Sequence, residues 1–599
     1  MDKQSLKHRI DVAAGRAPAD LRIANCQVVD VYNRTVFPAD VLIAGTYIAG
    51  FGAPSFPEAR QTYDAQGAYL APGLIDAHVH IESSHLSPAE FSRLVVPCGT
   101  TTVIADPHEI CNVCGLDGFD YMLGASEGIA LQVFLQVPSC VPCTPFEHAG
   151  AVLDAPEIAR RIGSDRVLGL GELMNFVGAC AGDDGILDKL MVAEGCGKIV
   201  DGHSPGLSGT LLDAYAASGV RNDHECATPR ELVERVRRGM YVMLRQGTAC
   251  HDVLNLLPGV NAGNDRFCLF CTDDRQPASL IRDGHIDNNI RLAVGAGLDP
   301  FTALRMATVN VADCYGLRDR GAVAPGKRAD LILFENPNEL YAREVWIGGR
   351  HVSSKGRYLA DDPHVEPVGV RGRMNVRDFS QARLALPLAS DRVRTIQLSP
   401  GSVVTGDGRA TVRRDAGGNW VRDDQDIVKI AVVERHKGTG NVGLGLLEGY
   451  GLRNGAVASS IAHDSHNIIV AGDNDRDMAL AVKRLVEIGG GLAVAQDGAV
   501  LGSLVHEIAG LMTDRPGDYV ASRIDKLCKL AWDRLGVHRE IDPFMALCFM
   551  ALPVIPMLKI TDTGLFDVNA FKNVPVEAGN TDLSGRDYVA AASTPPQAF

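Results

Sequence analysis

The chain has 599 residues, of which 46% are hydrophobic and 22% are charged, and its formal net charge at pH 7 is −15. A chain of this length is too long for a single core and predicts several domains. The composition is typical of a soluble globular protein, and the excess of acidic side chains argues against a nucleic-acid partner.

Targeting and membrane segments are not expected. Residues 1–5 lead into charged positions and not into an apolar signal segment. The most apolar late stretch, residues 544–558, is shorter than a membrane span and contains Pro553 and Pro556. The sequence therefore predicts a cytoplasmic protein with no membrane contact, in which the fifteen cysteines remain free thiols.

Three C-x-x-C pairs raise the alternative of a zinc ribbon or a redox motif; they lie at residues 111–114, 140–143 and 268–271. None of the pairs sits in a short module with a matching second pair. We interpret these cysteines as small buried hydrophobic residues.

Short strands separated by turns are predicted at both ends of a long middle region. One such segment comprises residues 1–65, and the same texture returns in residues 321–375. We expect the two segments to pair into one small β-sandwich.

The middle region, residues 66–320, contains eight short apolar runs that end in polar residues. In order, these runs end at His78/His80, Asp106/His108, Gln136 to Ser139, Glu172, His203, His224, Arg245 and Asp273. Most are separated by stretches long enough for a helix. The pattern predicts an α/β fold, a (β/α)8 TIM-like barrel whose active site lies at the carboxyl ends of its strands.

The texture changes again in residues 376–599. This part contains a predicted strand at 427–433, a predicted helix at 475–488 and a run of three glycines at 489–491. We expect a separate C-terminal α+β domain.

The strongest chemical signal is the sequence Pro-Gly-Leu-Ile-Asp-Ala-His-Val-His at residues 72–80. Residues two apart on a strand face the same way, so His78 and His80 are expected to point together into the barrel mouth. Two imidazoles on one rigid strand can share a metal ion.

Later strand ends supply further candidate metal ligands: Glu172, His203, His224 and Asp273. With His78 and His80 they make four histidines and two carboxylates. This set is sufficient for two divalent metal ions with one bridging carboxylate. Imidazole and carboxylate ligands suit zinc, iron and manganese alike.

The H-x-H motif, the single histidines on strands five and six and the aspartate on strand eight together resemble the amidohydrolase superfamily. The sequence Met-Ala-Thr-Val-Asn at residues 306–310 fits the same superfamily. Many members carry a carboxylated lysine on strand four as the metal bridge. The matching position here is Glu172, which the resemblance implies to be an unmodified bridge.

Narrower motifs resemble the adenine deaminase family of that superfamily. They lie in the barrel and in the C-terminal domain, at residues 81–84, 106–110, 201–207, 271–275, 434–440, 462–467 and 489–491. The resemblance implies an adenine-deaminase-type domain over residues 376–599. It also implies hydrolysis of adenine to hypoxanthine and ammonia, with iron or manganese favoured over zinc. A homodimer is the expected assembly for a large cytoplasmic enzyme.

The resemblance also implies roles for individual residues. Asp273 is the expected proton carrier, and His108 is the next candidate for moving a proton or orienting the hydroxide. Four further residues are expected either to read the purine edge or to hold the histidines in place: Glu82, Ser83, Asp106 and Arg245. The polar cluster of His463, Asp464 and His466 is interpreted as a domain-packing cluster, with a third metal site or a lid as the alternative.

Three rival functions follow from the same residues. Another amidohydrolase, acting on a cyclic amide or an amino sugar, would use the same ligand set. A different deaminase fold is suggested by His80-Ile81-Glu82 with the C-x-x-C at 140–143, but that signature leaves the later histidines unused. A non-catalytic scaffold would be expected to have lost ligands, and all six candidates are present.

Overall fold

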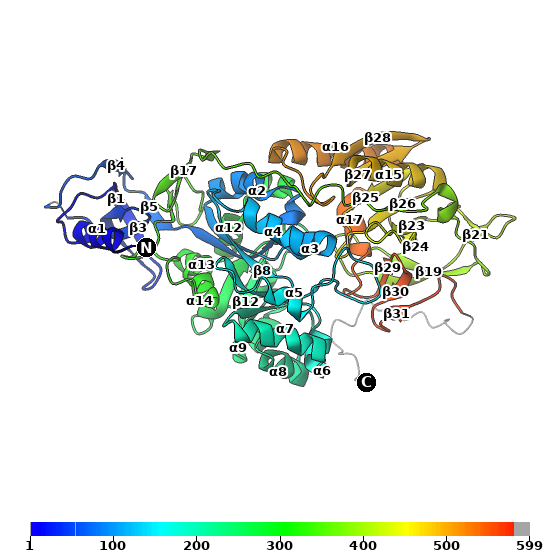
Figure 1. Cartoon of the computed structure of the whole chain (residues 1–599), viewed down its shortest axis with the longest axis horizontal. Coiled ribbons are helices and arrows are strands. Elements are labelled where there is room, and N and C mark those ends of the chain that lie inside the picture. Colours follow the sequence, from blue (N-terminus) through cyan, green and yellow to red (C-terminus); the bar gives the residue numbers. More distant parts are fainter. Residues whose placement is uncertain (1, 54, 580–599) are drawn as a thin grey trace.

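The computed structural model describes residues 2–53 and 55–579. Three parts follow one another along the long axis of the molecule: a mixed sheet at one end, an α/β core in the middle and a C-terminal domain at the other end (Figure 1). The last twenty residues of the predicted C-terminal domain, 580–599, lie outside the described residues.

The first part is a nine-stranded mixed sheet, which contains strands from both sequence segments that were predicted to pair into a β-sandwich. Its order is β18-β17-β16-β15-β5-β1-β2-β3, and β4 pairs with β1. The strands are β1 (Leu21–Asp30), β2 (Thr35–Ala44), β3 (Tyr47–Phe51), β4 (Gln61–Asp64), β5 (Tyr69–Pro72), β15 (Leu331–Phe334), β16 (Glu344–Ile347), β17 (Arg350–Ser354) and β18 (Arg357–Tyr358). Pairing of β5 with both β1 and β15 joins the two sequence segments. Helix α1 (Lys3–Ala13) packs against β2 and β3.

The middle part is a curled parallel sheet. Its strands are β6 (Leu74–His80), β7 (Thr100–Ala105), β8 (Gln132–Val137), β9 (Val167–Leu173), β10 (Ile199–Gly202), β11 (Asn222–Asp223), β12 (Tyr241–Arg245), β13 (Cys268–Cys271) and β14 (Asp273–Asp274). Hydrogen bonds connect them in the orders β10-β9-β8-β7-β6-β14 and β11-β12-β13. Only Thr272 separates β13 from β14. Because β13 pairs with β12 and β14 pairs with β6, residues 268–274 connect the two groups of strands. This curvature gives a TIM-like core, as the sequence predicts.

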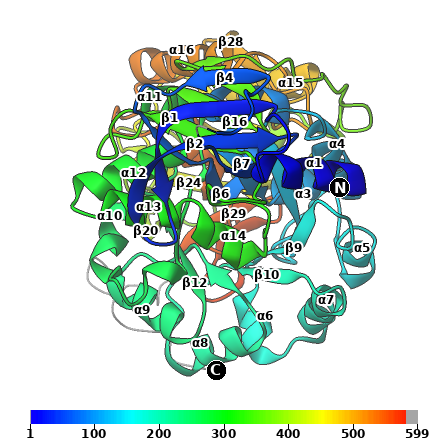
Figure 2. The same ribbon diagram turned by 90° about the vertical axis from the view of Figure 1, so that its left-hand side faces the viewer.

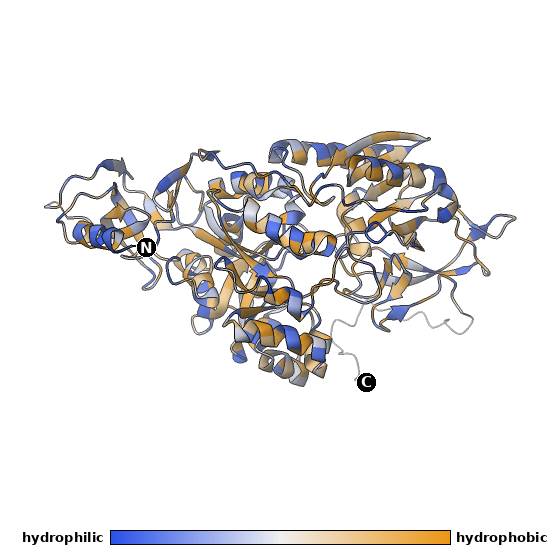
Figure 3. Cartoon of the chain, viewed as in Figure 1, coloured by the Kyte–Doolittle hydropathy of each residue, from blue (hydrophilic) through white to orange (hydrophobic). Residues whose placement is uncertain are grey.

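Helices cover the outside of this sheet, as Figure 2 shows. They are α2 (Pro88–Val95), α3 (His108–Cys114), α4 (Leu116–Ala125), α5 (Ala155–Ala159), α6 (Phe176–Ala181), α7 (Asp184–Gly195), α8 (Gly209–Ala217), α9 (Pro229–Arg237), α10 (Val253–Leu256), α11 (Pro277–Asp283), α12 (Ile286–Gly295), α13 (Pro300–Met306) and α14 (Val309–Tyr315). Local sequence fixes their ends: α9 begins with a capping box between Thr228 and Glu231 and has Pro229 in its first turn. In Figure 3 these helices carry both hydrophilic and hydrophobic residues, whereas the core strands are mainly hydrophobic.

The C-terminal domain is built on an eight-stranded sheet with the order β20-β19-β24-β23-β26-β25-β27-β28. Its strands are β19 (Arg392–Gln397), β20 (Gly406–Thr411), β23 (Ile427–Val433), β24 (Val442–Glu448), β25 (Ala456–Ser459), β26 (Ile468–Gly472), β27 (Gly491–Gln496) and β28 (Ala499–Val505). Smaller strands form a pair, β21 (Arg413–Arg414) and β22 (Trp420–Val421), and a triplet, β29 (Leu558–Thr561), β30 (Gly564–Asp567) and β31 (Lys572–Asn573). The helices are α15 (Asp475–Ile488), α16 (Gly517–Leu535) and α17 (Pro543–Met550).

Strand β23 explains why this sheet is covered on both faces. Ile430 and Val432 belong to one buried cluster, together with residues of α16 and α17, while Ala431 and Val433 belong to another with residues of α15. Alternate residues of a strand point to opposite faces, so a continuous apolar run requires a partner on each side. The sheet therefore lies between α15 and the pair α16 and α17.

The C-terminal domain docks onto loops at the carboxyl ends of the core strands. In the loop after β6, Ser87 N donates to Thr513 O at 2.9 Å, and Thr513 N donates to His85 O at 3.0 Å. In the loop after β8, His148 Nδ1 lies 2.6 Å from Asp562 Oδ2. Two separate strips of contact thus fix this domain over the polar strand ends.

Two further observations bear on the sequence-based expectations. No helix of the described residues is long and apolar enough to cross a membrane. All fifteen cysteines are unpaired, and four of the C-x-x-C cysteines, Cys111, Cys114, Cys268 and Cys271, are buried in the hydrophobic clusters of the core.

Candidate metal centre

His78 and His80 stand at the carboxyl end of β6 on one face of the strand. Both side chains are buried, and their Nε2 atoms lie 3.2 Å apart. The Nδ1 atom of His80 lies 2.8 Å from the carbonyl oxygen of Asp106, so it must carry the proton that it donates. This hydrogen bond leaves the lone pair of His80 Nε2 pointing at the centre of the site, as a metal ligand requires.

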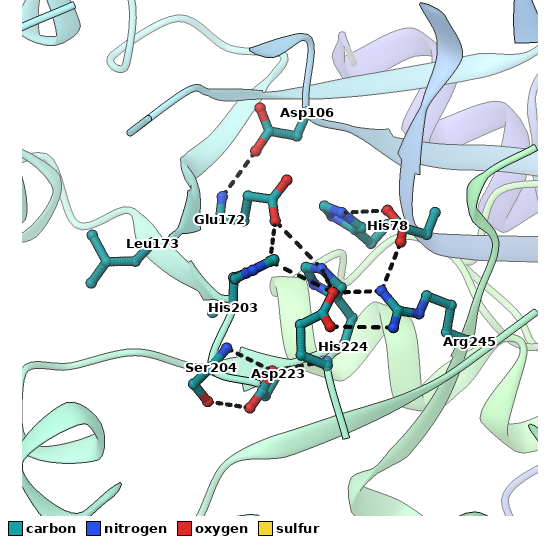
Figure 4. Close-up of polar contacts among 12 residues, drawn as sticks. His78, Asp106, Glu172, Leu173, His203, Ser204, Asp223, His224 and Arg245 are labelled. Carbon is teal, nitrogen blue, oxygen red and sulfur yellow. Dashed lines mark hydrogen bonds and ion pairs between the residues drawn. The ribbon is translucent and has the colours of Figure 1, made fainter. Parts of the chain in front are cut away.

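Glu172, at the end of β9, lies among four histidines. Its Oε1 atom is 3.3 Å from His80 Nε2 and 3.0 Å from His108 Nδ1. Its Oε2 atom is 2.8 Å from His203 Nδ1 and 3.4 Å from His224 Nε2, and dashed lines mark both contacts of this oxygen in Figure 4. The two oxygens thus face different imidazoles, which is the arrangement of a bridging carboxylate.

Asp273 approaches from the last strand segment. Its backbone φ is +59°, in the left-handed region, and this interrupts the extended strand between β13 and β14. The Oδ1 atom lies 3.1 Å from His80 Nε2 and 3.6 Å from His78 Nε2. The Oδ2 atom accepts a hydrogen bond of 2.9 Å from Nη1 of Arg245.

The donor set of this cluster fits divalent metal ions. His80 Nε2 presents a lone pair, yet its nearest neighbours include the carboxylate oxygens of Glu172 and Asp273, which are also acceptors. Buried acceptors that face one another need a shared cation or proton between them. Three of the groups with close ligand atoms are His78/His80/Glu172, Glu172/His203/His224 and His78/His224/Asp273. Imidazole and carboxylate donors suit such ions.

The electrostatics of Glu172 reflect this crowding. Burial alone would raise its pKa, but contacts with His108, His203, His224 and His80 hold the pKa well below its usual range. Behind the centre, burial raises the pKa of Asp201 to about 7, against hydrogen bonds from Asn222, Tyr315 and Gln136. Contact with the histidines therefore favours the charged form of Glu172, whereas burial favours the neutral form of Asp201.

A cavity opens in front of the cluster. From the α/β core it is lined by His80, His108, Glu172, Met174, His203, His224, Glu225, Arg245, Cys250, Asp273 and Asp274. From the C-terminal domain it is lined by Val403, His463, Asp464, Phe549, Leu552 and Ile555. A small molecule held there would contact both the metal ligands and the C-terminal domain.

The four residues expected to read the substrate or to hold the histidines have different positions. Arg245 lines the cavity, whereas Glu82, Ser83 and Asp106 are buried and do not line it. Asp106 Oδ2 accepts a hydrogen bond of 2.9 Å from the backbone N of Glu172. These positions favour the holding role over the reading role for the three buried residues.

Ser83 and Glu82 have partners of their own behind the cavity. Ser83 Oγ contacts Asp274 Oδ1 and lies 2.6 Å from Glu109 Oε1. Glu82 Oε1 accepts from the backbone N of Ile110 at 3.2 Å, and burial, with the neighbouring charge of Glu109, raises the Glu82 pKa to about 8. Both side chains thus connect the loop after β6 with helix α3.

Glu225 is a site residue that the sequence analysis missed. It lines the cavity, its Oε1 lies 3.3 Å from His224 Nε2, and it accepts hydrogen bonds from Nη1 and Nη2 of Arg245. Arg245 Nε also donates to Asp252 at 3.2 Å. The only sequence feature that points to Glu225 is its position directly after His224.

The histidines on strands five and six are held by buried networks. Asp223, next to His224, accepts from Nε of Arg235 at 2.9 Å, and both of these side chains are fully buried. Ser204, next to His203, donates its hydroxyl to Asp223, as Figure 4 shows. One ion pair therefore fixes the backbone beside two of the candidate ligands.

The C-terminal polar cluster divides between the cavity and the protein interior. His463 and Asp464 line the cavity, whereas His466 is fully buried. The Nδ1 atom of His466 accepts from Ala462 N at 3.3 Å, so its Nε2 atom carries the proton and faces Glu109 Oε2 at 3.9 Å. This tautomer favours the packing interpretation for His466, while the close ligand atoms of Glu109, His463 and His466 keep the third metal site as the alternative.

A curled parallel core with H-x-H on its first strand and single ligands on later strand ends defines an amidohydrolase. Residues 69–374 match the model of the amidohydrolase family, and residues 402–572 match that of the adenine deaminase C-terminal domain. The chain belongs to the adenine deaminase family, since full-length relatives of that name align with nearly all of it.

Three such relatives come from different bacteria. Adenine deaminase of Nitratidesulfovibrio vulgaris strain DP4 is 53% identical over 94% of this chain and 98% of its own length. Adenine deaminase 2 of Desulfotalea psychrophila is 48% identical over 96% of this chain and 100% of its own length. Adenine deaminase of Ligilactobacillus salivarius is 46% identical over 95% of this chain and 99% of its own length.

Proposed function

We propose that this chain catalyses the hydrolytic deamination of adenine to hypoxanthine and ammonia. The observation that carries the proposal is a cavity in front of the cluster of His78, His80, Glu172, His203, His224 and Asp273, of which all but His78 line it. The relatives named adenine deaminase, which align over 94% or more of the chain, supply the substrate.

The cluster is proposed to hold two divalent ions per chain, with iron or manganese favoured and zinc as an alternative. His78, His80 and Asp273 would serve one ion and His203 and His224 the other, while Glu172 would be shared between them. When bound, such ions lower the pKa of a coordinated water towards about 7 and so supply hydroxide at neutral pH.

Asp273 is proposed to move the protons of the reaction. Its Oδ2 atom is held by Arg245, and its Oδ1 atom faces the histidines, so this carboxylate is fixed beside the position of attack. It would take a proton from the attacking water and deliver it to the ring nitrogen N1, and then pass the remaining hydroxyl proton to the amino group, which leaves C6 as ammonia. His108, which also lines the cavity, is proposed to orient the attacking oxygen.

Several structural proposals accompany this function. The curled core is taken as a closed (β/α)8 barrel over residues 66–320, and the mixed sheet as a sandwich formed by residues 1–65 and 321–375. Residues 376–599 form the C-terminal adenine-deaminase-type domain. A cytoplasmic homodimer is the proposed assembly.

A substrate panel tests the proposed function. After loading with manganese, the protein is assayed for ammonia release from adenine, adenosine and AMP, and for ring opening of hydantoin and dihydrouracil. Ammonia release from adenine, lost on chelation and restored by manganese, supports the proposal. Faster turnover of a cyclic amide than of adenine would favour the rival amidohydrolase function, and inactivity on every compound with full metal content would favour a scaffold.

A further inference from the structure

The C-terminal domain contributes a largely apolar wall to the cavity. Four of its six lining residues are Val403, Phe549, Leu552 and Ile555, and the other two are His463 and Asp464. The α/β core contributes mainly charged and metal-competent side chains to the same cavity. A substrate therefore meets catalytic groups from one domain and hydrophobic surface from another.

Two rings on this wall are stacked on each other. The centroids of His463 and Phe549 lie 4.8 Å apart, with 24° between the ring planes. The two residues are only 7% and 8% exposed, and the backbone N of His463 donates to the carbonyl of Cys548 in α17 at 3.1 Å. The pair is thus fixed in place by packing and by the backbone beside it.

A buried lysine holds the same wall together. Lys559 is fully buried, and its Nζ atom donates to the carbonyl oxygens of Val403 at 2.8 Å and Phe549 at 3.0 Å. Among the described residues, no carboxylate lies within 4 Å of this ammonium group. An unpaired lysine in the interior is unfavourable for stability, and here its donors join two chain segments that line the cavity. We interpret Lys559 as a positioning residue for the wall.

We propose that Phe549 and His463 form the surface against which the planar base of the substrate packs. This inference rests on the proposed function and adds to it the side chains that hold the base. Bases have a π-face that stacks on aromatic side chains.

Three variants test the inference: Phe549→Leu, Phe549→Tyr and the control Phe544→Leu. Phe544 lies on the same helix, α17, and is also buried, but it does not line the cavity. Three quantities are measured: KM and kcat for adenine, and the Kd of purine, which has no amino group to lose. We expect Phe549→Leu to weaken purine binding and raise KM by about 10- to 100-fold, with a smaller change in kcat. Phe549→Tyr keeps the ring and should retain near wild-type values, as should Phe544→Leu.

The outcomes separate this inference from the proposed function. Unchanged purine Kd and KM in Phe549→Leu, with active wild-type enzyme, would overturn the stacking role. Equal losses in Phe549→Leu and Phe544→Leu would also overturn it, because the effect would then come from packing of α17. A wild-type protein that binds purine but releases no ammonia from adenine would defeat the proposed function, and the purine Kd of the variants would still decide the stacking role.

Discussion

Nη1 of Arg245 lies 2.9 Å from Oδ2 of Asp273, on the side of the carboxylate away from the histidines. The same guanidinium also engages Glu225 and Asp252. Arg245 therefore occupies one oxygen of Asp273 and leaves the other for the metal centre and the proton. One oxygen of Asp273 is thus held in place and the other is free to react, which makes Asp273 the central residue of the proposed chemistry.

Asp273→Asn should lower kcat by at least about 100-fold, since it removes a general acid–base group. Asp274→Asn is the matched control: its side chain contacts Ser83 and no candidate metal ligand among the described contacts. It should have a clearly smaller effect on kcat. Steady-state kinetics on both variants, with circular dichroism to verify folding, decide the assignment. A larger loss for Asp274→Asn would reverse the roles of the two residues.

Glu172→Gln should lose metal together with activity. A neutral amide is a poor bridge between two cations, and the variant keeps the size of the side chain at the centre of four imidazoles. Elemental analysis of the purified variant measures the outcome. Retention of two full equivalents of metal would remove Glu172 from the bridging position.

Arg235→Met should destabilise the fold by about 3–5 kcal/mol, because it leaves Asp223 as a buried, unpaired charge. Denaturant unfolding measures this loss of free energy. The exposed pair of Arg230 and Glu234 on the same helix gives the control, since Arg230→Met should change stability by less than about 1 kcal/mol. Equal effects of the two substitutions would contradict a structural role for the buried pair.

Lys559 should make stability rise with pH in the alkaline range. Burial lowers its pKa from 10.5 to about 7, so between these values the unfolded chain binds more protons than the folded chain. Its contribution to the free energy of unfolding therefore increases as pH rises through this window, by at most about 1.4 kcal/mol per pH unit. Comparing wild type with Lys559→Met at several pH values cancels the other groups. A stability difference that does not change with pH would show that the lysine titrates normally.

The sequence allowed the architecture of the core to be predicted because its signal is local. Each apolar run carries its polar residue at its own end, and H-x-H on β6 follows directly from the two-residue period of a strand. The parallel core was predicted from such patterns, the flanking sheet from strand-and-turn segments on either side of the core, and the C-terminal domain from a change in sequence character and from family motifs. The left-handed backbone of Asp273 was not, since it depends on how the last strand meets β6.

The C-terminal wall of the cavity could not be predicted. Phe549 and Leu552 belong to the late apolar stretch that the sequence identifies only as buried core, and they reach the cavity because two contact strips dock one domain on another. Glu225 was missed for a related reason. The neighbouring His224 accounts for the motif on its own, and the contact between Glu225 and Arg245 joins side chains from different parts of the core. A contact between two segments that are far apart in the sequence produces no periodic pattern in the sequence of either segment.

The most direct test of a two-metal adenine deaminase is a titration of metal-free protein with manganese, followed by the rate of hypoxanthine formation from adenine. The wild-type rate should rise until about two equivalents of metal per chain have been added, as expected for a site with a shared carboxylate. Full activity at one equivalent would contradict the shared role of Glu172. Metal uptake without any conversion of adenine would contradict the proposed function itself.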